Sequence, residues 1–255
     1  IGDGAFYSCL SLPTISISGS VELGKDLFCY CWKLSEIRVV GEEENLKMAD
    51  GVLFNKEMTR LVWCSREKSG SYEIPPTVKT IDSCAFHLCE KLTSVTIPDS
   101  ITEIASCTFS DCSGLESVII PQSVVTIGEY AFSECIALAT VNIPNSVASI
   151  CCHAFSSCSA LVSVSIPDSV ISIDEYAFSE CIALATITIP DSVTYIGEFA
   201  FVNCDRLETV TIPRSVISIG FSAFDYCHRL EVAYVPQDLK CAVIAFQPNV
   251  IINWY

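Results

Sequence analysis

The chain has 255 residues, of which 51% are hydrophobic, and its 30 acidic against 14 basic side chains give a net charge of -16. Such a surplus of negative charge repels phosphate backbones and anionic membrane surfaces, so no nucleic acid partner is expected. No window of about 18 residues is free of polar breaks, and the sequence therefore predicts no transmembrane segment in this chain. The hydrophobic residues are expected to form a core.

A 23-residue period runs through most of the chain. Ile-Pro dipeptides recur at this spacing from Ile74-Pro75 to Ile212-Pro213, and Val235-Pro236 continues the series. The twelve residues from Glu129 to Thr140 recur letter for letter at Glu175 to Thr186, two periods later. A fixed period of this length indicates one elongated domain of stacked units, because a single unit buries too few side chains to be stable alone.

Two columns of side chains mark the predicted core. Phenylalanine and cysteine each recur at the same step without an insertion, so stacking would place each residue on its own counterpart. The phenylalanine column is Phe86, Phe109, Phe132, Phe155, Phe178, Phe201 and Phe224, and the cysteine column is Cys89, Cys112, Cys135, Cys158, Cys181, Cys204 and Cys227. We expect these cysteines to be buried free thiols, because the parallel Cβ vectors of stacked residues suit a disulfide poorly.

Four regions follow one another along the chain. Residues 1–39 contain imperfect N-terminal repeats, in which Cys9 and Cys31 take the place of the column cysteine. Residues 40–73 interrupt the period, and we expect a β-hairpin there that leaves the edge of the array. Its strand candidates, Val52 to Phe54 and Leu61 to Trp63, flank a polar turn at residues 55–57.

Residues 74–236 contain the regular repeats. In each unit a segment such as Leu115 to Ile120 alternates inward and outward positions, as a β-strand does, and a proline then ends the strand. A second extended segment follows, for example Ser123 to Ile127. The Ala-Phe-x-x-Cys segment spaces its apolar residues at helical intervals, so we predict one short helical or 3-10 turn there. Residues 237–255 depart from the period again, and we interpret them as a C-terminal cap.

The string IPDSVTYIGEFAFVNCDRLETVTIP resembles the BspA-like class of leucine-rich repeats, strongly from Ile74 to Pro236 and more weakly over residues 1–40. The resemblance implies a leucine-rich repeat solenoid of 23-residue coils with parallel strands, in which residues 40–73 hold the hairpin unit that recurs in this family. Studied members are surface-exposed adhesins or interaction modules, so the resemblance favours a cell-surface or secreted location. It does not by itself fix a function, because one fold hosts many activities.

The sequence offers no convergent catalytic or metal-binding set. His87, His153 and His228 lie at different phases of the unit, so stacking does not bring them together. Serine or threonine lies two residues after most of the prolines that end the predicted strands. Its hydroxyl group is expected to form a hydrogen bond with the backbone of a turn. These residues are Thr77, Ser100, Ser123, Ser146, Ser169, Ser192 and Ser215. We therefore expect a noncatalytic protein without a metal or cofactor.

The cysteines outside the main column are the candidates for bridging or reactivity. Cys84 and Cys107 share a second column on adjacent coils, and Cys151 and Cys152 are neighbours in the chain. The others are Cys29, Cys64 and Cys241. None has the paired spacing of a zinc site.

The outward positions of the longer strand form the candidate binding surface. One outward column is Thr96, Ile119, Asn142, Ser165, Thr188, Thr211 and Tyr234, and beside it lie Ser94, Ser117, Thr140, Ser163, Thr186, Thr209 and Val232. Small β-favouring residues suit an unobstructed sheet, and the same surface also suits a long contact with a ligand. In that case three side chains that depart from the serine and threonine pattern would give the surface a preference for one ligand, namely Ile119, Asn142 and Tyr234.

Three functions follow from these observations. The leading hypothesis is an interaction or adhesion module that binds a protein or a glycan along the solenoid, since a long repeated surface is present and a converging polar site is not. The alternative is a structural component that associates into a surface layer or larger complex. A third is ice binding, suggested by Thr186 to Thr188 and Thr209 to Thr211, but Ile119, Asn142 and Tyr234 interrupt that row.

Overall fold

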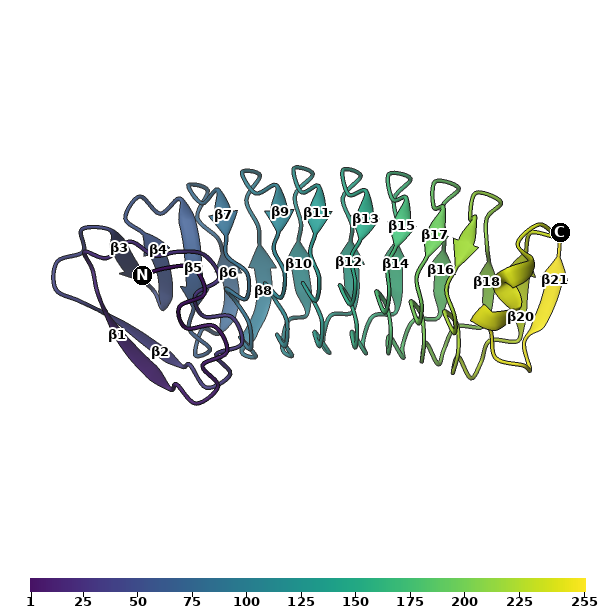
Figure 1. The fold of residues 1–255 in the computed structure, drawn as a ribbon, viewed down its shortest axis with the longest axis horizontal. Helices are drawn as coiled ribbons and strands as arrows, with labels where there is room; N and C mark the ends of the chain where they lie inside the picture. Colours follow the sequence, from purple (N-terminus) through teal and green to yellow (C-terminus); the bar gives the residue numbers. More distant parts are fainter.

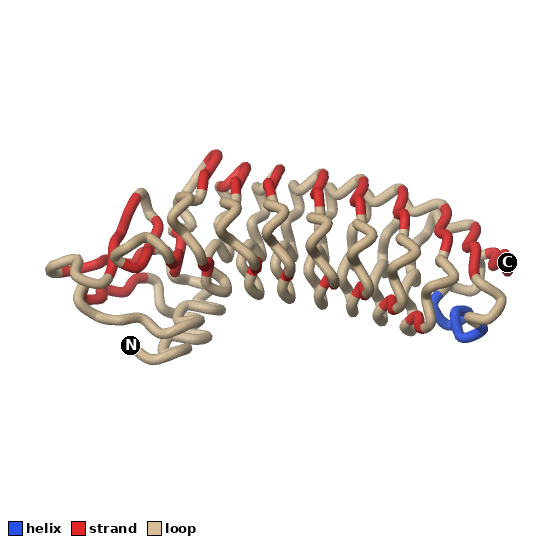
Figure 2. Tube along the Cα trace, turned by 90° about the horizontal axis from the view of Figure 1, so that it is seen from above, coloured by secondary structure: helices blue, strands red, loops and turns tan.

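The chain forms an elongated solenoid. The structure is a computed structural model that describes the backbone of residues 1–255 and every side chain except those of Lys240 and Cys241. Figure 1 shows the coils side by side along the long axis, and Figure 2 shows the strands lying along two edges of the rod. No helix within the described residues has the length and hydrophobicity needed to cross a membrane.

Each regular coil contributes one longer strand and one two-residue strand to two parallel columns. The longer strands are β6 (Gly70–Glu73), β8 (Leu92–Thr96), β10 (Ser117–Ile119), β12 (Thr140–Asn142), β14 (Ser163–Ser165), β16 (Thr186–Thr188), β18 (Thr209–Thr211) and β20 (Val232–Val235). The short strands are β7 (Thr80–Ile81), β9 (Glu103–Ile104), β11 (Thr126–Ile127), β13 (Ser149–Ile150), β15 (Ser172–Ile173), β17 (Tyr195–Ile196) and β19 (Ser218–Ile219). Val95 pairs with Val118, and Ile127 with Ile150, so neighbouring coils keep the 23-residue step. The predicted solenoid of parallel strands is confirmed.

The N-terminal segment, residues 1–40, is a less regular part of the same stack. Strands β1 (Thr14–Ser18) and β2 (Glu36–Val40) pair in parallel, but with a 22-residue step that aligns Thr14 with Glu36. Their apolar side chains form a core cluster of their own, which includes Leu27, Leu34 and Ile37. The shorter step shows why the sequence of this region reads as an imperfect repeat.

The hairpin lies inside the solenoid and does not leave its edge. Strands β4 (Val52–Asn55) and β5 (Arg60–Cys64) are antiparallel, β3 (Leu46–Ala49) adds a third antiparallel strand, and β5 pairs in parallel with β7. Phe54 and Leu61 are buried in the main core, whereas Leu53 and Trp63 are buried in the N-terminal core. The predicted hairpin is confirmed, but its expected position was wrong, because both of its faces are apolar and each needs a core.

The third side of each coil is a run of turns rather than the predicted helical or 3-10 turn. Two residues per coil have left-handed backbone angles, for example Tyr130 with φ of 56° and Glu134 with φ of 59°. Such residues stop a helix from propagating. They also leave backbone N–H groups free to bond the next coil, as Phe132 N does to Ala154 O at 2.8 Å. The turn backbone therefore adds a third ladder to the stack.

The core columns lie where the period predicts. Every phenylalanine of the column is fully buried, and neighbouring rings stack with centroids 4.9 to 5.4 Å apart. The column cysteines are buried too, and most donate a hydrogen bond to a phenylalanine carbonyl one coil earlier, as Cys158 Sγ does to Phe132 O at 3.2 Å. The thiol therefore fills space and also satisfies a buried carbonyl.

The serine and threonine hydroxyl groups that follow the prolines form hydrogen bonds with backbone carbonyl groups, as predicted. Ser123 Oγ donates to Ile101 O at 2.6 Å, and Ser192 Oγ donates to Val170 O at 2.7 Å. Ser215 differs, because its buried hydroxyl has no hydrogen-bond partner among the described side chains and backbone groups. At the other positions of this series, the bond joins the segment after the proline to the coil before it.

The C-terminal segment extends the stack with a shorter step. A 3-10 helix, η1 (Lys240–Ala245), precedes β21 (Ile251–Trp254), which pairs in parallel with β20. Phe246 comes one residue early in the sequence but still stacks on Phe224, with ring centroids 5.2 Å apart. The phenylalanine column therefore continues into this segment.

We predict that Phe155→Ala lowers the free energy of unfolding by about 3 to 5 kcal/mol, because it removes a fully buried ring between two stacked neighbours. Chemical denaturation of the whole chain measures the change. Thr188→Ala, at an exposed position of a strand, is the control and should have little effect. A loss below about 1 kcal/mol for Phe155→Ala would mean that the column does not support the core.

Candidate binding surfaces

The outward columns of the longer strands form one continuous surface, which we call the long-strand face. The parallel register aligns Thr96 with Ile119 and Thr211 with Tyr234, and Asn142, Ser165 and Thr188 follow one another in the same column. All seven of these residues are exposed except Thr96, which is half-buried. The structure thus brings the candidate binding residues together in one row.

The long-strand face carries little charge. Its second column consists of serine and threonine up to Val232. The residue between the two columns is buried, and it is valine or isoleucine in every strand except β20, where it is Ala233. Charge begins one position before the second column, at Glu116, Glu208 and Glu231, which are exposed. The large exposed side chains of the row are Ile119, at 63% exposure, and Tyr234, at 43%.

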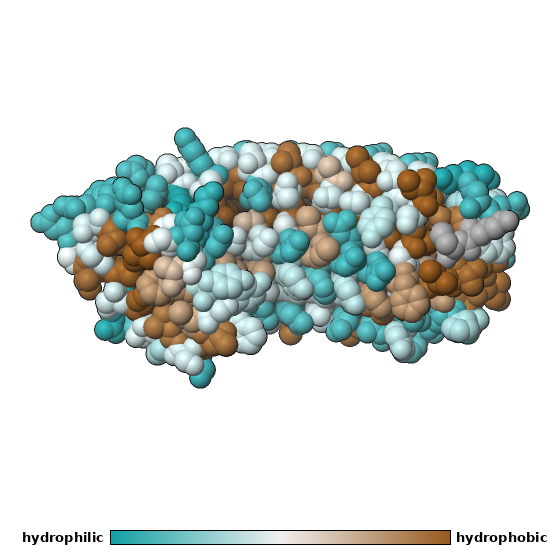
Figure 3. All heavy atoms as spheres, in the orientation of Figure 1, coloured by the Kyte–Doolittle hydropathy of each residue, from teal (hydrophilic) through white to brown (hydrophobic). Residues whose placement is uncertain are grey.

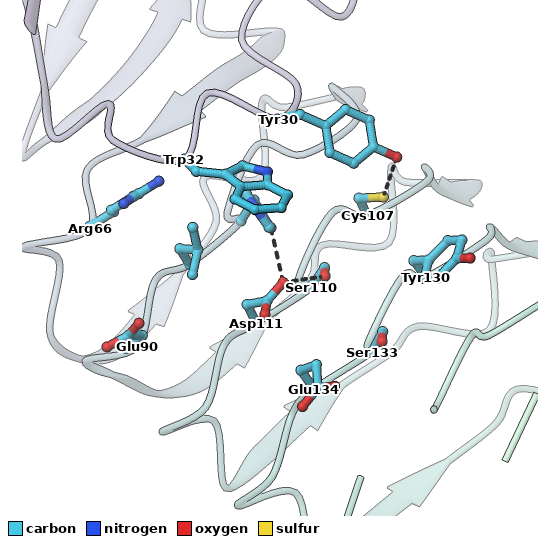
Figure 4. A pocket seen from close by; sticks show the side chains of 12 residues that line it. Tyr30, Trp32, Arg66, Glu90, Cys107, Ser110, Asp111, Tyr130, Ser133 and Glu134 are labelled. Carbon is cyan, nitrogen blue, oxygen red and sulfur yellow. Dashed lines mark hydrogen bonds and ion pairs between the residues drawn. The ribbon is translucent and has the colours of Figure 1, made fainter. Parts of the chain in front are cut away.

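A second surface, which the sequence did not predict, is a pocket of about 660 Å³ between the N-terminal segment and the turns of the first regular coils. In Figure 4, Tyr30 and Trp32 overhang the pocket from the N-terminal segment, and Asp111, Ser133 and Glu134 lie across from them. The remaining lining residues are Arg66, His87, Leu88, Glu90, Cys107, Ser110 and Tyr130.

The pocket exists because a ladder of aromatic rings stops at Cys107. Tyr130, His153, Tyr176 and Phe199 occupy equivalent turn positions and stack, with ring centroids 4.4 to 4.9 Å apart. The same position in the preceding coil holds Cys107, whose side chain is too small to continue the ladder. The space beside Tyr130 is therefore left open.

His87 and Asp111 shape the floor of the pocket. His87 occupies a turn position that later coils fill with small buried residues such as Ser110 and Ser133. Its Nδ1 lies 3.4 Å from Oδ2 of Asp111, yet neither ring nitrogen has a well-formed hydrogen bond within the described residues. Burial lowers the pKa of His87, so the ring is neutral at neutral pH. Ser110 Oγ donates to the same carboxylate at 2.7 Å.

Cys107 belongs to a cluster of three thiols next to this pocket. Cys29, Cys84 and Cys107 pack together, and Tyr30 joins them with its hydroxyl 3.6 Å from Cys107 Sγ. Hydrogen bonds to the Cys107 sulfur from Cys84 and, more weakly, from Tyr30 lower its pKa to about 7, against the opposing effect of burial. The cluster thus contains one acidic thiol held between two donors.

Cys64, Cys151 and Cys152 lie outside this cluster. Cys64 is buried, and Cys151 and Cys152 are half-buried with pKa values raised mainly by burial. All fifteen cysteines whose side chains are described are free, whereas Cys241 lies outside the described side chains. His153 lies in the aromatic ladder, and His228 faces Asp205 at 3.9 Å, so the histidines stay apart. No group of three potential metal ligands occurs among the residues described.

We predict that iodoacetamide alkylates Cys107 with a pH midpoint of about 7, and that Tyr30→Phe raises this midpoint, because it removes a donor to the thiolate. Peptide mass spectrometry of alkylation rates at a series of pH values measures both. Cys152 is the internal control, with a midpoint above that of an ordinary thiol. Identical midpoints for the two cysteines, or no response to Tyr30→Phe, would contradict the described cluster.

Comparison with known proteins places this chain among repeat proteins. The family model described as the BspA type leucine rich repeat region matches six times, over residues 1–66, 56–161 and 149–247. A search of curated proteins finds no match.

Solved structures give the same result for the fold. A leucine-rich repeat protein from Eubacterium ventriosum is 29% identical with a TM-score of 0.60, and the match covers 76% of this chain and 59% of that one. The pneumococcal vaccine antigen PcpA is 20% identical with a TM-score of 0.61, and the match covers 96% of this chain and 56% of that one. This chain therefore spans little more than half of each of these relatives. With the family model matching along most of its length, the chain belongs to the BspA-type leucine-rich repeat family.

Proposed function

We propose that the chain is a noncatalytic interaction or adhesion module that binds a protein along the long-strand face. One observation carries the proposal: two outward columns follow the parallel strands over successive coils and present uncharged side chains, most of them serine, threonine or asparagine. A surface of this kind can be desolvated at low cost, because few charges have to give up their water. Membership of a repeat family whose extended surfaces bind partners supports the same function.

The side chains of the face favour a protein over a glycan. Hydroxyl groups can donate and accept hydrogen bonds, and Ile119 and Tyr234 provide apolar anchors at separate points of the row. Sugar rings pack against aromatic faces, and Tyr234 is the single aromatic residue of the two outward columns. A glycan ligand therefore has less to bind on this face than a polypeptide has.

A structural role in a larger assembly is the second candidate, and one observation favours it. Phe221, Val243 and Ile244 are each more than half exposed near the C-terminal end, where the backbone N–H of Ser222 bonds Ile244 O. Figure 3 shows hydrophobic side chains gathered at this end of the rod, on the right. Light scattering at increasing concentration separates the two functions, since a particle that stays monomeric disfavours self-assembly.

The proposal predicts that Ile119→Arg and Thr188→Arg each weaken capture of the protein partner, because a charge in a desolvated contact costs free energy. Pull-down from surface extracts, followed by binding measurements with the purified partner, gives the readout. We expect a loss of roughly tenfold or more in affinity.

A matched substitution on another side of the coils provides the control. Ile171→Arg changes an isoleucine of similar exposure beside the short strands, and it should leave capture unchanged. A thermal melt of each variant checks that the fold is intact. Unaltered binding after substitution of both outward columns would place the ligand on a different surface.

A further inference from the structure

We infer that the pocket between the N-terminal segment and the first regular coils binds an alkylammonium group, such as the end of a lysine side chain or a quaternary amine. The pocket joins aromatic rings from two distant parts of the chain to a set of carboxylates. This site is separate from the long-strand face, and neither proposal depends on the other.

Three aromatic rings provide the walls. Tyr130 is held by His153 on one face, with ring centroids 4.4 Å apart, while its other face looks toward the small Cys107 and the open pocket. Trp32 is 57% exposed, although indole rings are largely buried in most folded proteins. Tyr30 completes the set, with its hydroxyl held by Cys107. Aromatic faces around a cavity attract cations through the ring quadrupole.

The charges of the pocket have the sign that a cation needs. Glu90, Asp111 and Glu134 line it, against the single cation Arg66. The guanidinium of Arg66 is engaged in the structure, because it donates to Cys31 O at 3.1 Å and so holds the N-terminal segment. Burial keeps His87 neutral, so it adds no positive charge. The net balance repels phosphates and carboxylates and favours an ammonium group.

Asp111 is the carboxylate best placed to meet the ligand. Ser110 Oγ donates to it at 2.7 Å, and the buried His87 ring lies 3.4 Å from the same oxygen. The hydrogen bond from Ser110 orients the carboxylate before a ligand arrives, which reduces the entropy lost on binding. Asp111 and Trp32 line the same pocket and are both labelled in Figure 4, so a cation bound there has a carboxylate and an aromatic ring available.

Equivalent positions in other coils do not offer this combination. The chain repeats the twelve residues around Glu134 without change around Glu180, but Tyr176 in the second copy is covered on both faces by His153 and Phe199. The N-terminal segment does not reach that copy, and Glu180 lines none of the described pockets. The site therefore depends on where the ladder ends and not on the repeat itself.

Binding of three small probes tests the inference on the intact chain. Choline and Nα-acetyl-lysine methylamide carry the cation, and 3,3-dimethylbutan-1-ol has the shape of choline without its charge. Calorimetric titration measures affinity, and fluorescence of a Trp254→Phe variant reports on Trp32, because Trp63 is buried elsewhere. We expect at least one cation to bind and the neutral alcohol to bind roughly tenfold more weakly.

Matched variants locate the binding. Glu134→Gln and Tyr130→Ala should each weaken cation binding roughly tenfold. Glu180→Gln and Tyr176→Ala change the equivalent residues of the second copy and should leave cation binding unaltered. Binding of the lysine probe alone would identify a partner's side chain as the source, and binding of choline alone a small quaternary amine. Equal affinity for the neutral alcohol, equal effects of both variant pairs, or no binding of either cation would overturn the inference.

Discussion

The regular part of the structure depends on one constraint, the 23-residue parallel register between successive coils. Because Val95 lies beside Val118 and Phe132 lies on Phe155, each layer of the core has to accommodate the side chain directly above it. A phenylalanine ring stacks well on another phenylalanine ring, so stacking favours nearly the same residues in every coil. This accounts for the unchanged twelve-residue copy, since identical layers satisfy the stack as well as divergent ones do.

A regular stack also shows where the molecule departs from it. On the turn side, aromatic rings stack in successive coils up to Tyr130, and Cys107 takes the equivalent position in the coil before it. One coil earlier than Ser110, the position that four later coils fill with a small serine is occupied by the larger side chain of His87. The N-terminal segment packs over this irregular part and contributes Tyr30 and Trp32. On the long-strand face the register is kept, so binding there would use an extended surface, whereas the pocket would hold a single chemical group.

The sequence predicted the features that periodicity controls. The phenylalanine and cysteine columns, the strands and the outward row follow from a spacing that can be counted, and the hairpin follows from its two apolar segments. The sequence did not predict the left-handed turn residues, because Tyr130 and Glu134 carry no local signal for positive φ. It also missed the pocket, since the contact between Tyr30 and Cys107 joins residues 77 positions apart that no period relates. Two residues could have indicated the pocket in the sequence. His87 stands where the next four coils have a serine, and Cys107 stands where the next four coils have an aromatic ring or a histidine.

Distances between spin labels on the long-strand face test the register most directly. Labels at Ser117 and Thr209, or at Thr140 and Val232, are separated by the same number of coils, and neighbouring parallel strands are about 4.8 Å apart. Pulsed electron paramagnetic resonance should therefore give both pairs the same mean distance of about 19 Å between attachment points, rising to about 29 Å for Ser94 with Val232. Unequal distances for the first two pairs, or no increase for the third, would contradict a stack in register.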